Sequence, residues 1–186
     1  MAANPEFDGL DIAVAPMHRR HLKSVVAIEA AVYPRPWSMS LFLSELALTS
    51  SRAYFVAKTG RHVVGYVGLM MSDDDGHITT IAVDPDWQRH KIGTRLMLTA
   101  AREAIQRGAQ SLTLEVRVAN KGAQAMYRRF GFLPVGVRRN YYQETNEDAL
   151  VMWADDVHTP GYRRRLNGIE GSVPGTTLIE MEDDWS

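Results

Sequence analysis

The segment from residue 77 to residue 118 constrains the fold more than any other part of the chain, because it predicts a parallel strand pair. "HITTIAV" (77–83) is an apolar strand, the helix from Gly93 to about Arg107 carries a broad apolar stripe, and "SLTLEVRV" (111–118) alternates as a second strand. A strand, a helix and a strand of these lengths are typical of a right-handed crossover between parallel strands.

The other elements up to residue 154 predict antiparallel strands and further helices around this junction. Strands at 52–58 and 62–71 flank Thr59-Gly60-Arg61, and the turn "SDDDG" (72–76) returns the chain into the junction. The remaining expected elements are a strand at 10–16, helices at 18–33, 39–48 and 121–130, and strands at 132–139 and 148–154. The fold class is therefore α/β (α+β): a mixed, mostly antiparallel sheet with helices and one parallel junction.

The chain of 186 residues is long enough for one domain, which we place at residues 1–154. Residues 155–186 lose the hydrophobic periodicity and hold a basic cluster, several glycines and an acidic end. We interpret them as a C-terminal tail of unknown role, solvated or loosely docked, and expect residues 1–154 to fold without it. The alternative is a segment that covers the substrate groove or contacts a partner.

Composition excludes several classes of function. The formal net charge of −1 favours neither nucleic acid nor a membrane surface as a partner. The chain has no cysteine, its six histidines lack metal-ligand spacing, and no apolar run is long enough to span a membrane. We therefore expect a soluble cytoplasmic protein without a metal.

The bend at 88–94, "QRHKIGT", is a candidate phosphate site. It lies between a strand and a helix start, where the first backbone N–H groups have no partner within the helix and the helix dipole is positive. Arg89, His90 and Lys91 add positive charge, and basic residues at a helix start are unfavourable unless an anion binds there. The alternative is a basic, solvated helix start. The bend is neither a Walker loop nor a dinucleotide fingerprint, because it contains one glycine.

Glu115 and Tyr127 are the residues that could carry acid–base chemistry. Glu115 lies in the middle of the second junction strand, on the same face as Thr113 and Arg117. Its alternative role is an ion pair with Arg117. Asn120 is a plausible N-cap for the next helix, and Tyr127 lies two turns along that helix, where a core role is the commoner one.

Three segments in this order resemble the GCN5-related N-acetyltransferase (GNAT) superfamily: "IAVDPDWQRHKIGTRLM", "LEVRVANKGAQAMYRRFGF" and "RRNYYQETNEDALVM". Within it they are most similar to the bacterial RimI branch, the ribosomal-protein alanine N-acetyltransferases, and "RPWS" (35–38) is similar to the substrate loop of that branch. The resemblance covers roughly residues 10–154. It implies the GNAT fold, with helices on both faces of the sheet and the coenzyme at the parallel junction.

The resemblance also implies acetyl-coenzyme A as acetyl donor and a site that is assigned residue by residue. Glu115 matches the general base and Tyr127 the general acid. The expected coenzyme contacts are Ile81, Ala82 and Val83 for the pantetheine arm and thioester, the bend Arg89, His90, Lys91, Ile92, Gly93 and Thr94 for the pyrophosphate, and Asn120. The expected acceptor groove is shaped by Trp37, Tyr141 and Tyr142.

The implied activity is transfer of acetyl to a protein N-terminal amine, most of all the N-terminal alanine of a small-subunit ribosomal protein. Alternatives are other N-termini, lysine side chains or small amines as acceptors, or a coenzyme-A-binding module without turnover. Lys91 departs from the superfamily pattern, because it occupies the first glycine position of [QR]-x-x-G-x-[GA]. If that position needs a positive φ, lysine costs about 1–2 kcal/mol, and we expect it to affect coenzyme affinity more than the fold.

Overall fold

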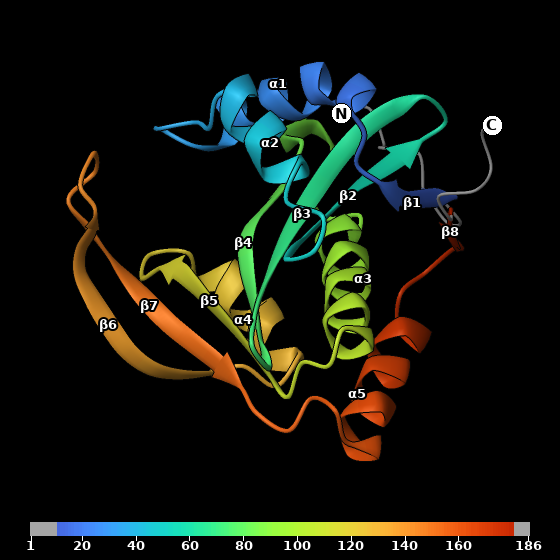
Figure 1. The fold of residues 1–186 in the computed structure, drawn as a ribbon, viewed down its shortest axis with the longest axis vertical. Helices are drawn as coiled ribbons and strands as arrows, with labels where there is room; N and C mark the ends of the chain where they lie inside the picture. Colours follow the sequence, from blue (N-terminus) through green and yellow to red (C-terminus); the bar gives the residue numbers. More distant parts are fainter. Residues whose placement is uncertain (1–10, 181–186) are drawn as a thin grey trace, which may run out of the picture.

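The computed structural model describes residues 11–180, which form one eight-stranded sheet with helices packed on it (Figure 1). The strands are β1 (Ile12–Pro16), β2 (Arg52–Thr59), β3 (His62–Ser72), β4 (Asp75–Val83), β5 (Ser111–Arg117), β6 (Leu133–Tyr142), β7 (Glu147–Ala154) and β8 (Thr177–Ile179). The helices are α1 (Leu22–Val32), α2 (Met39–Leu46), α3 (Ile92–Gln106), α4 (Lys121–Arg129) and α5 (Pro160–Gly171), with 3-10 turns η1 (Arg19–His21) and η2 (Pro85–Trp87).

The sheet has the order β6-β7-β5-β4-β3-β2-β1-β8. The prediction of a mostly antiparallel sheet with a parallel junction is confirmed, because β4 and β5 pair in parallel and the meander β2–β3–β4 is antiparallel. A second parallel pair, which we did not predict, joins β8 to β1 at the far edge.

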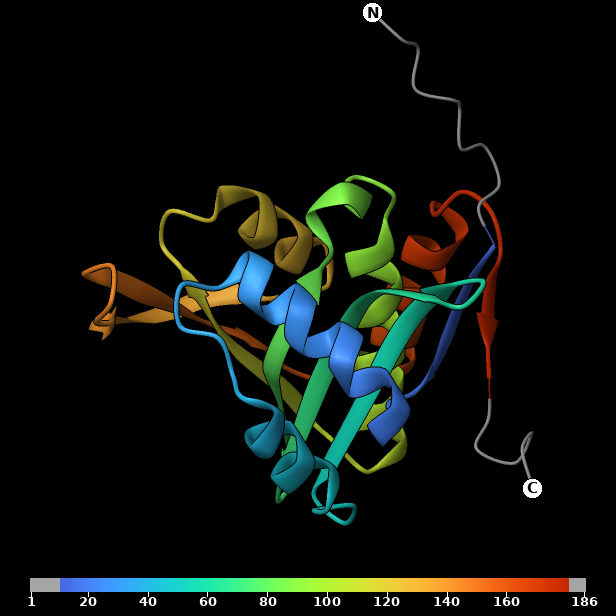
Figure 2. The same cartoon turned by 90° about the horizontal axis from the view of Figure 1, so that it is seen from above.

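Helices cover both faces of this sheet, as predicted, and each face has its own apolar core (Figure 2). Helices α1 and α2 pack on one face through Leu22, Val25 and Phe42. Helices α3, α4 and α5 pack on the other face, where α3 contributes an almost continuous buried stripe that includes Leu96 and Met97. The sheet, including its parallel junction, therefore lies between two packed layers of helices.

The parallel junction opens into a V. Strands β4 and β5 pair only from Asp75–Ser111 to His77–Thr113, although both continue toward Val83 and Arg117. A bulge between β3 and β4 at Gly68 bends β4 near the opening. Only glycine fits there, because a Cβ would overlap the Tyr54 ring and the Thr79 hydroxyl. The strand ends beyond the last pair therefore separate and leave room for a ligand.

The prediction of a solvated or loosely docked C-terminal tail is wrong for the residues described beyond 155. Val157, Tyr162, Leu166 and Ile169 are at most 7% exposed and belong to the same core as α3. The Tyr162 hydroxyl donates a hydrogen bond of 2.7 Å to the carbonyl of Phe130. Figure 1 shows α5 beside α3. Basic residues between the apolar positions of α5 hid this one-sided stripe in the sequence.

The last strand is tied to α3 by a buried arginine. Arg95, which is 2% exposed, donates hydrogen bonds to the hydroxyl of Thr177 and to the carbonyl of Pro174. Burial lowers the pKa of its guanidinium. Arg95 lies one residue after the predicted coenzyme bend, so the C-terminal segment is joined to the start of α3 as well as to the core.

Candidate active site

A cleft of about 1030 Å³ occupies the open end of the parallel junction. All of the predicted site residues line it except His90. The His90 ring instead lies beside Trp87, with ring centroids 6.1 Å apart. The cleft receives side chains from α1, β4, the start of α3, β5, α4 and the β6–β7 turn, so it joins elements that are far apart in the sequence.

The bend before α3 has the backbone of an anion cradle. Arg89 and Lys91 have positive φ angles of 68° and 58°, and α3 begins directly afterwards at Ile92. The first hydrogen bond of the helix runs from the N–H of Arg95 to the carbonyl of Lys91, so the N–H groups between them have no acceptor within the helix. Successive free N–H groups in a bend with left-handed residues, at a positive helix end, fit a phosphate group.

The left-handed φ of Lys91 bears on our expectation about coenzyme affinity. The strain is present in the protein without a ligand, so it lowers the stability of the bend. We expect Lys91→Gly to raise the free energy of unfolding by up to about 1 kcal/mol, since relief of about 1–2 kcal/mol is partly offset by the flexibility of glycine when unfolded. Chemical denaturation measures this change.

Lys91→Ala is the matched control, because it removes the charge and keeps the strained backbone. We expect both variants to bind acetyl-coenzyme A a few-fold more weakly than the parent at low salt, with the difference vanishing at high salt. Calorimetric titration at two salt concentrations measures both effects. A stabilised Lys91→Ala variant would contradict the account of the strain.

Glu115 points from β5 into the cleft and is held from two sides. Its Oε2 lies 3.0 Å from Nε2 of His77, and its Oε1 lies 3.6 Å from the guanidinium of Arg138. Only 13% of the Glu115 side chain is exposed. The alternative ion pair between Glu115 and Arg117 is not formed, because Arg117 turns toward the β6–β7 turn.

The contacts of Glu115 keep it ionised. The hydrogen bond from His77 and the charge of Arg138 lower the pKa of Glu115, while burial opposes them. A buried carboxylate that is ionised at neutral pH can hold an ammonium group and accept its proton, directly or through one water molecule.

Tyr127 is buried in α4, with 5% exposure, and lines the same cleft. Its ring lies 5.9 Å from that of Phe132, so it packs in the core and reaches the cleft at the same time. Burial, followed by the neighbouring Tyr33 and Tyr142, raises the pKa of the Tyr127 phenol. The phenol is therefore neutral at physiological pH and can donate to a developing anion.

Asn120 caps α4 as predicted, because its side-chain oxygen accepts a hydrogen bond of 3.1 Å from the N–H of Ala123. Next to it, the side-chain amide of Gln124 donates to the carbonyls of Arg117 and Val118. These bonds fix the turn between β5 and α4. They set the distance between the strand that carries Glu115 and the helix that carries Tyr127.

Sequence reasoning missed a buried cluster on the α1 side of the cleft. Glu29, which is 2% exposed, accepts hydrogen bonds from the Tyr66 hydroxyl and, at 3.0 Å, from the backbone N–H of Trp37. Burial raises the pKa of Glu29. The Tyr33 hydroxyl donates to the carbonyl of Ile81 at 2.6 Å. A carboxylate on the apolar face of α1 was the signal that could have revealed the cluster.

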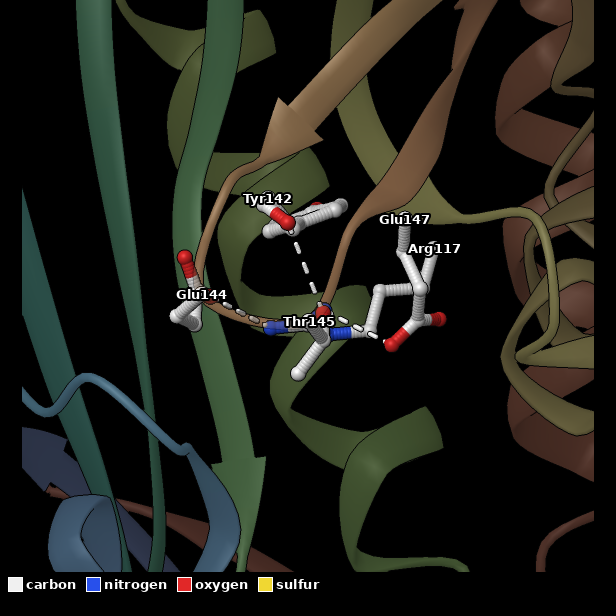
Figure 3. Close-up of polar contacts among 5 residues, drawn as sticks. All are labelled: Arg117, Tyr142, Glu144, Thr145 and Glu147. Carbon is white, nitrogen blue, oxygen red and sulfur yellow. Dashed lines mark hydrogen bonds and ion pairs between the residues drawn. The ribbon is translucent and has the colours of Figure 1, made fainter.

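Arg117 holds the turn between β6 and β7 in place at the edge of the cleft (Figure 3). Its guanidinium donates to Glu144 at 2.9 Å, to Thr145 at 2.7 Å and to Glu147 at 3.1 Å. It also lies 3.9 Å from the centre of the Tyr142 ring. Four contacts to one turn fix the position of Tyr142 at the cleft.

We expect Arg117→Ala to raise the KM for the acceptor by several-fold to about tenfold, because partly buried ion pairs and a cation–π contact are lost together. The affinity for acetyl-coenzyme A should not change, since the bend before α3 is untouched. Arg139→Ala, which removes an exposed arginine of β6, is the control. Steady-state kinetics with varied acceptor measures the effect. An unchanged KM would show that the turn is held without Arg117.

The part of the chain that the structure describes contains no helix long and apolar enough to cross a membrane. Within residues 11–180 there is also no cluster of three or more histidine, aspartate or glutamate side chains placed to hold a metal ion.

Comparisons with known proteins identify the family. The profile of the Acetyltransferase (GNAT) family matches residues 22–132. A Bacillus subtilis protein, named provisionally as a ribosomal protein bS18-alanine N-acetyltransferase, is 38% identical over 141 residues, which are 76% of this chain and 93% of that protein. The ribosomal protein bS18-alanine N-acetyltransferase of Escherichia coli K12 is 31% identical over 141 residues, 75% of this chain and 94% of the enzyme.

A solved structure gives the same result for the fold. The crystal structure of the ribosomal-protein-S18-alanine N-acetyltransferase from Escherichia coli matches with a TM-score of 0.71 at 29% identity, over 78% of this chain and 94% of that one. The family profile spans more than half of the chain. The chain belongs to the GNAT family of acetyltransferases.

Proposed function

We propose that this protein is an N-alpha-acetyltransferase that moves acetyl from acetyl-coenzyme A to a protein N-terminal amine. One observation carries the proposal: an ionised carboxylate, Glu115, and a neutral phenol, Tyr127, line one cleft at the open parallel junction, beside a backbone cradle for a phosphate. The names of the relatives add the acceptor. We infer that it is the N-terminal alanine of ribosomal protein bS18.

The ends of the cleft suit the two substrates. Arg89 and Lys91 stand at the bend, and Arg129 lies at the end of α4, so cationic side chains meet the phosphates of the coenzyme. The ionised carboxylate of Glu115 comes from β5. An ammonium group is favoured on that side, and the charge of the cleft thereby orients both substrates.

The chemistry follows from the protonation states. Acetyl-coenzyme A supplies the thioester carbonyl that the amine attacks. A peptide N-terminus has a pKa near 8, so Glu115 must first accept its proton. The nitrogen lone pair then forms the C–N bond as the C–S bond breaks. Tyr127 gives its phenolic proton to the leaving thiolate and regains one, directly or through water, from the acetylated nitrogen, which becomes the neutral amide. A backbone N–H near Val83 stabilises the oxyanion.

Substrate positions follow from the same contacts. We assign the pantetheine arm to the backbone at 81–83, where β4 has left its partner strand, and the pyrophosphate to the bend at 89–94. Trp37, Tyr141 and Tyr142 shape the groove for the acceptor. Since Tyr33 already donates to the carbonyl of Ile81, that acceptor on β4 is satisfied before any ligand binds.

The test is an acetyl-transfer assay on a panel of peptides. One peptide carries the first residues of ribosomal protein bS18, and the others differ in the first residue or carry a blocked N-terminus. We expect the alanine peptide to have the highest kcat/KM and the blocked peptide to be inert. Binding of acetyl-coenzyme A without transfer to any peptide would contradict the proposal and identify a coenzyme-A-binding module.

A further inference from the structure

His77 and Thr113 form the last pair of the parallel junction before it opens. Nδ1 of His77 lies 2.6 Å from the hydroxyl oxygen of Thr113, and Nε2 lies 3.0 Å from Oε2 of Glu115. Three side chains from two strands thus form a continuous hydrogen-bonded chain, Thr113–His77–Glu115. It ends on the carboxylate to which we assign proton transfer.

The chemistry of these groups sets the direction of the hydrogen bonds. An ionised carboxylate can only accept, so Nε2 of His77 carries the hydrogen that Glu115 accepts. In the neutral imidazole, Nδ1 is then an acceptor, and the Thr113 hydroxyl donates to it. Thr113 thereby selects the tautomer of His77 that can donate to Glu115.

His77 provides the strongest of the contacts that keep Glu115 ionised. Among the causes of its lowered pKa, the hydrogen bond from His77 comes first, and the charge of Arg138 is weaker. Arg138 is 57% exposed and 3.6 Å away, so solvent screens it. Burial acts in the opposite direction, so loss of the hydrogen bond would raise the pKa of Glu115.

The other groups near Glu115 cannot replace His77. On β6, Tyr141 and Tyr142 have raised pKa values and face the carboxylate as neutral phenols. On β7, the paired residue is the apolar Val151. On β5 itself, Arg117 is committed to the β6–β7 turn. The imidazole of His77, 3.0 Å from Oε2, is therefore the side chain on which the lowered pKa of Glu115 chiefly depends.

We propose that His77, with its tautomer fixed by Thr113, is a positioning residue that keeps Glu115 ionised by holding Oε2. The acceptor ammonium is then left to Oε1, whose one recorded partner within residues 11–180 is the exposed Arg138 at 3.6 Å. This role rests on the proposed function, since it assumes that Glu115 takes the proton. His77 itself does not touch the substrate. It acts through the carboxylate, as hydrogen-bonded partners commonly orient and tune a reactive group.

The direct test reads the Glu115 carboxyl without any substrate. The protein is labelled with carboxyl-¹³C glutamate, Glu115 is assigned by comparison with Glu115→Gln, and its pKa is measured by NMR. We expect His77→Leu to raise this pKa by about one pH unit or more, because the largest contact that lowers it is lost and burial is then opposed only by weaker ones. His77→Gln keeps an N–H donor at similar reach and should restore most of the parent value.

Two variants of Thr113 test the same hydrogen-bonded chain without changing His77. They keep the inference testable if His77→Leu does not fold. Thr113→Val cannot donate to Nδ1 and should raise the pKa of Glu115 by less than His77→Leu does. Thr113→Ser keeps the hydroxyl and should match the parent. An unchanged pKa of Glu115 in the folded His77→Leu and Thr113→Val variants would overturn the inference.

Kinetics separate this inference from the proposed function. We expect His77→Leu to lose kcat by up to about tenfold at pH values below the raised pKa of Glu115, where a shift of one unit lowers the ionised fraction most. At alkaline pH kcat should approach that of the parent, and the KM for acetyl-coenzyme A should be unchanged throughout. A loss that is the same at every pH would mark His77 as merely structural and would overturn the inference. A parent protein without transferase activity would refute the proposed function, whereas the NMR titration would still decide the role of His77.

Discussion

Glu115→Gln is expected to lower turnover by about 10²–10⁴ while leaving the affinity for acetyl-coenzyme A unchanged. The amide keeps the shape of the side chain and can remain in the same pocket beside His77. It has no basic oxygen of comparable strength, so the acceptor ammonium keeps its proton and its lone pair is not available for attack. Single-turnover kinetics and calorimetric titration of the coenzyme measure the two effects separately.

The control for this variant is Glu103→Gln. Glu103 is a carboxylate on α3 that pairs with Arg107 at 2.7 Å and lies outside the cleft. The Glu103→Gln variant loses the same charge, but no group of the proposed site changes, so its turnover should equal that of the parent. If Glu115→Gln turned over within a factor of two of the parent, the carboxylate would have no part in proton transfer.

Truncation after Ala154 is expected to abolish folding or to destabilise the domain severely, contrary to the prediction from sequence. The deletion removes four buried apolar residues, Val157, Tyr162, Leu166 and Ile169. Burial of each side chain contributes about 1.5–3 kcal/mol to the free energy of unfolding, so losing all of them removes a large part of a typical stability of about 5–15 kcal/mol. Strand β1 also loses its partner β8, and Arg95 loses the hydrogen-bond acceptors of its buried guanidinium.

A chain that ends after Glu180 is the matched control, because it keeps every described contact of α5 and β8. Leu166→Ala is a milder probe of the same packing and should cost about 2–5 kcal/mol. Denaturant unfolding followed by circular dichroism measures all three proteins. A fully folded 1–154 fragment with parental stability would restore the prediction of a dispensable tail.

The sheet and its junction could be predicted because their signals are local. Apolar periodicity identified β4, α3 and β5, and their lengths implied the parallel crossover. The N-cap of α4 was also local, because Asn120 accepts a hydrogen bond from the N–H of Ala123. Signals of this kind depend on neighbours within a few residues.

The sequence analysis missed the two C-terminal elements, α5 and β8, for different reasons. Helix α5 had a start signal in Thr159-Pro160, where the threonine side chain caps the N–H of Tyr162, but arginines and glycines masked its apolar face. Strand β8 has three residues and is stabilised by pairing with β1. A strand that short carries no periodicity of its own.

The partners of the charged site residues could not be predicted, because they depend on register and on a distant turn. The pairing of His77 with Glu115 follows from the parallel register between β4 and β5, which alternation within a strand does not specify. Arg117 lies two residues from Glu115, yet it reaches across to Glu144 and Glu147. Sequence analysis thus found the chemical groups, and the tertiary structure decides how they are paired.

The central claim is tested most directly by locating the acetyl group on a peptide that offers two acceptors. The peptide begins with alanine, carries an internal lysine, and is incubated with the parent protein and acetyl-coenzyme A. Fragment mass spectrometry then assigns the modified nitrogen. The account predicts acetyl on the N-terminal nitrogen, in a reaction that Glu115→Gln nearly abolishes. Acetyl on the lysine, or equal transfer by both proteins, would contradict it.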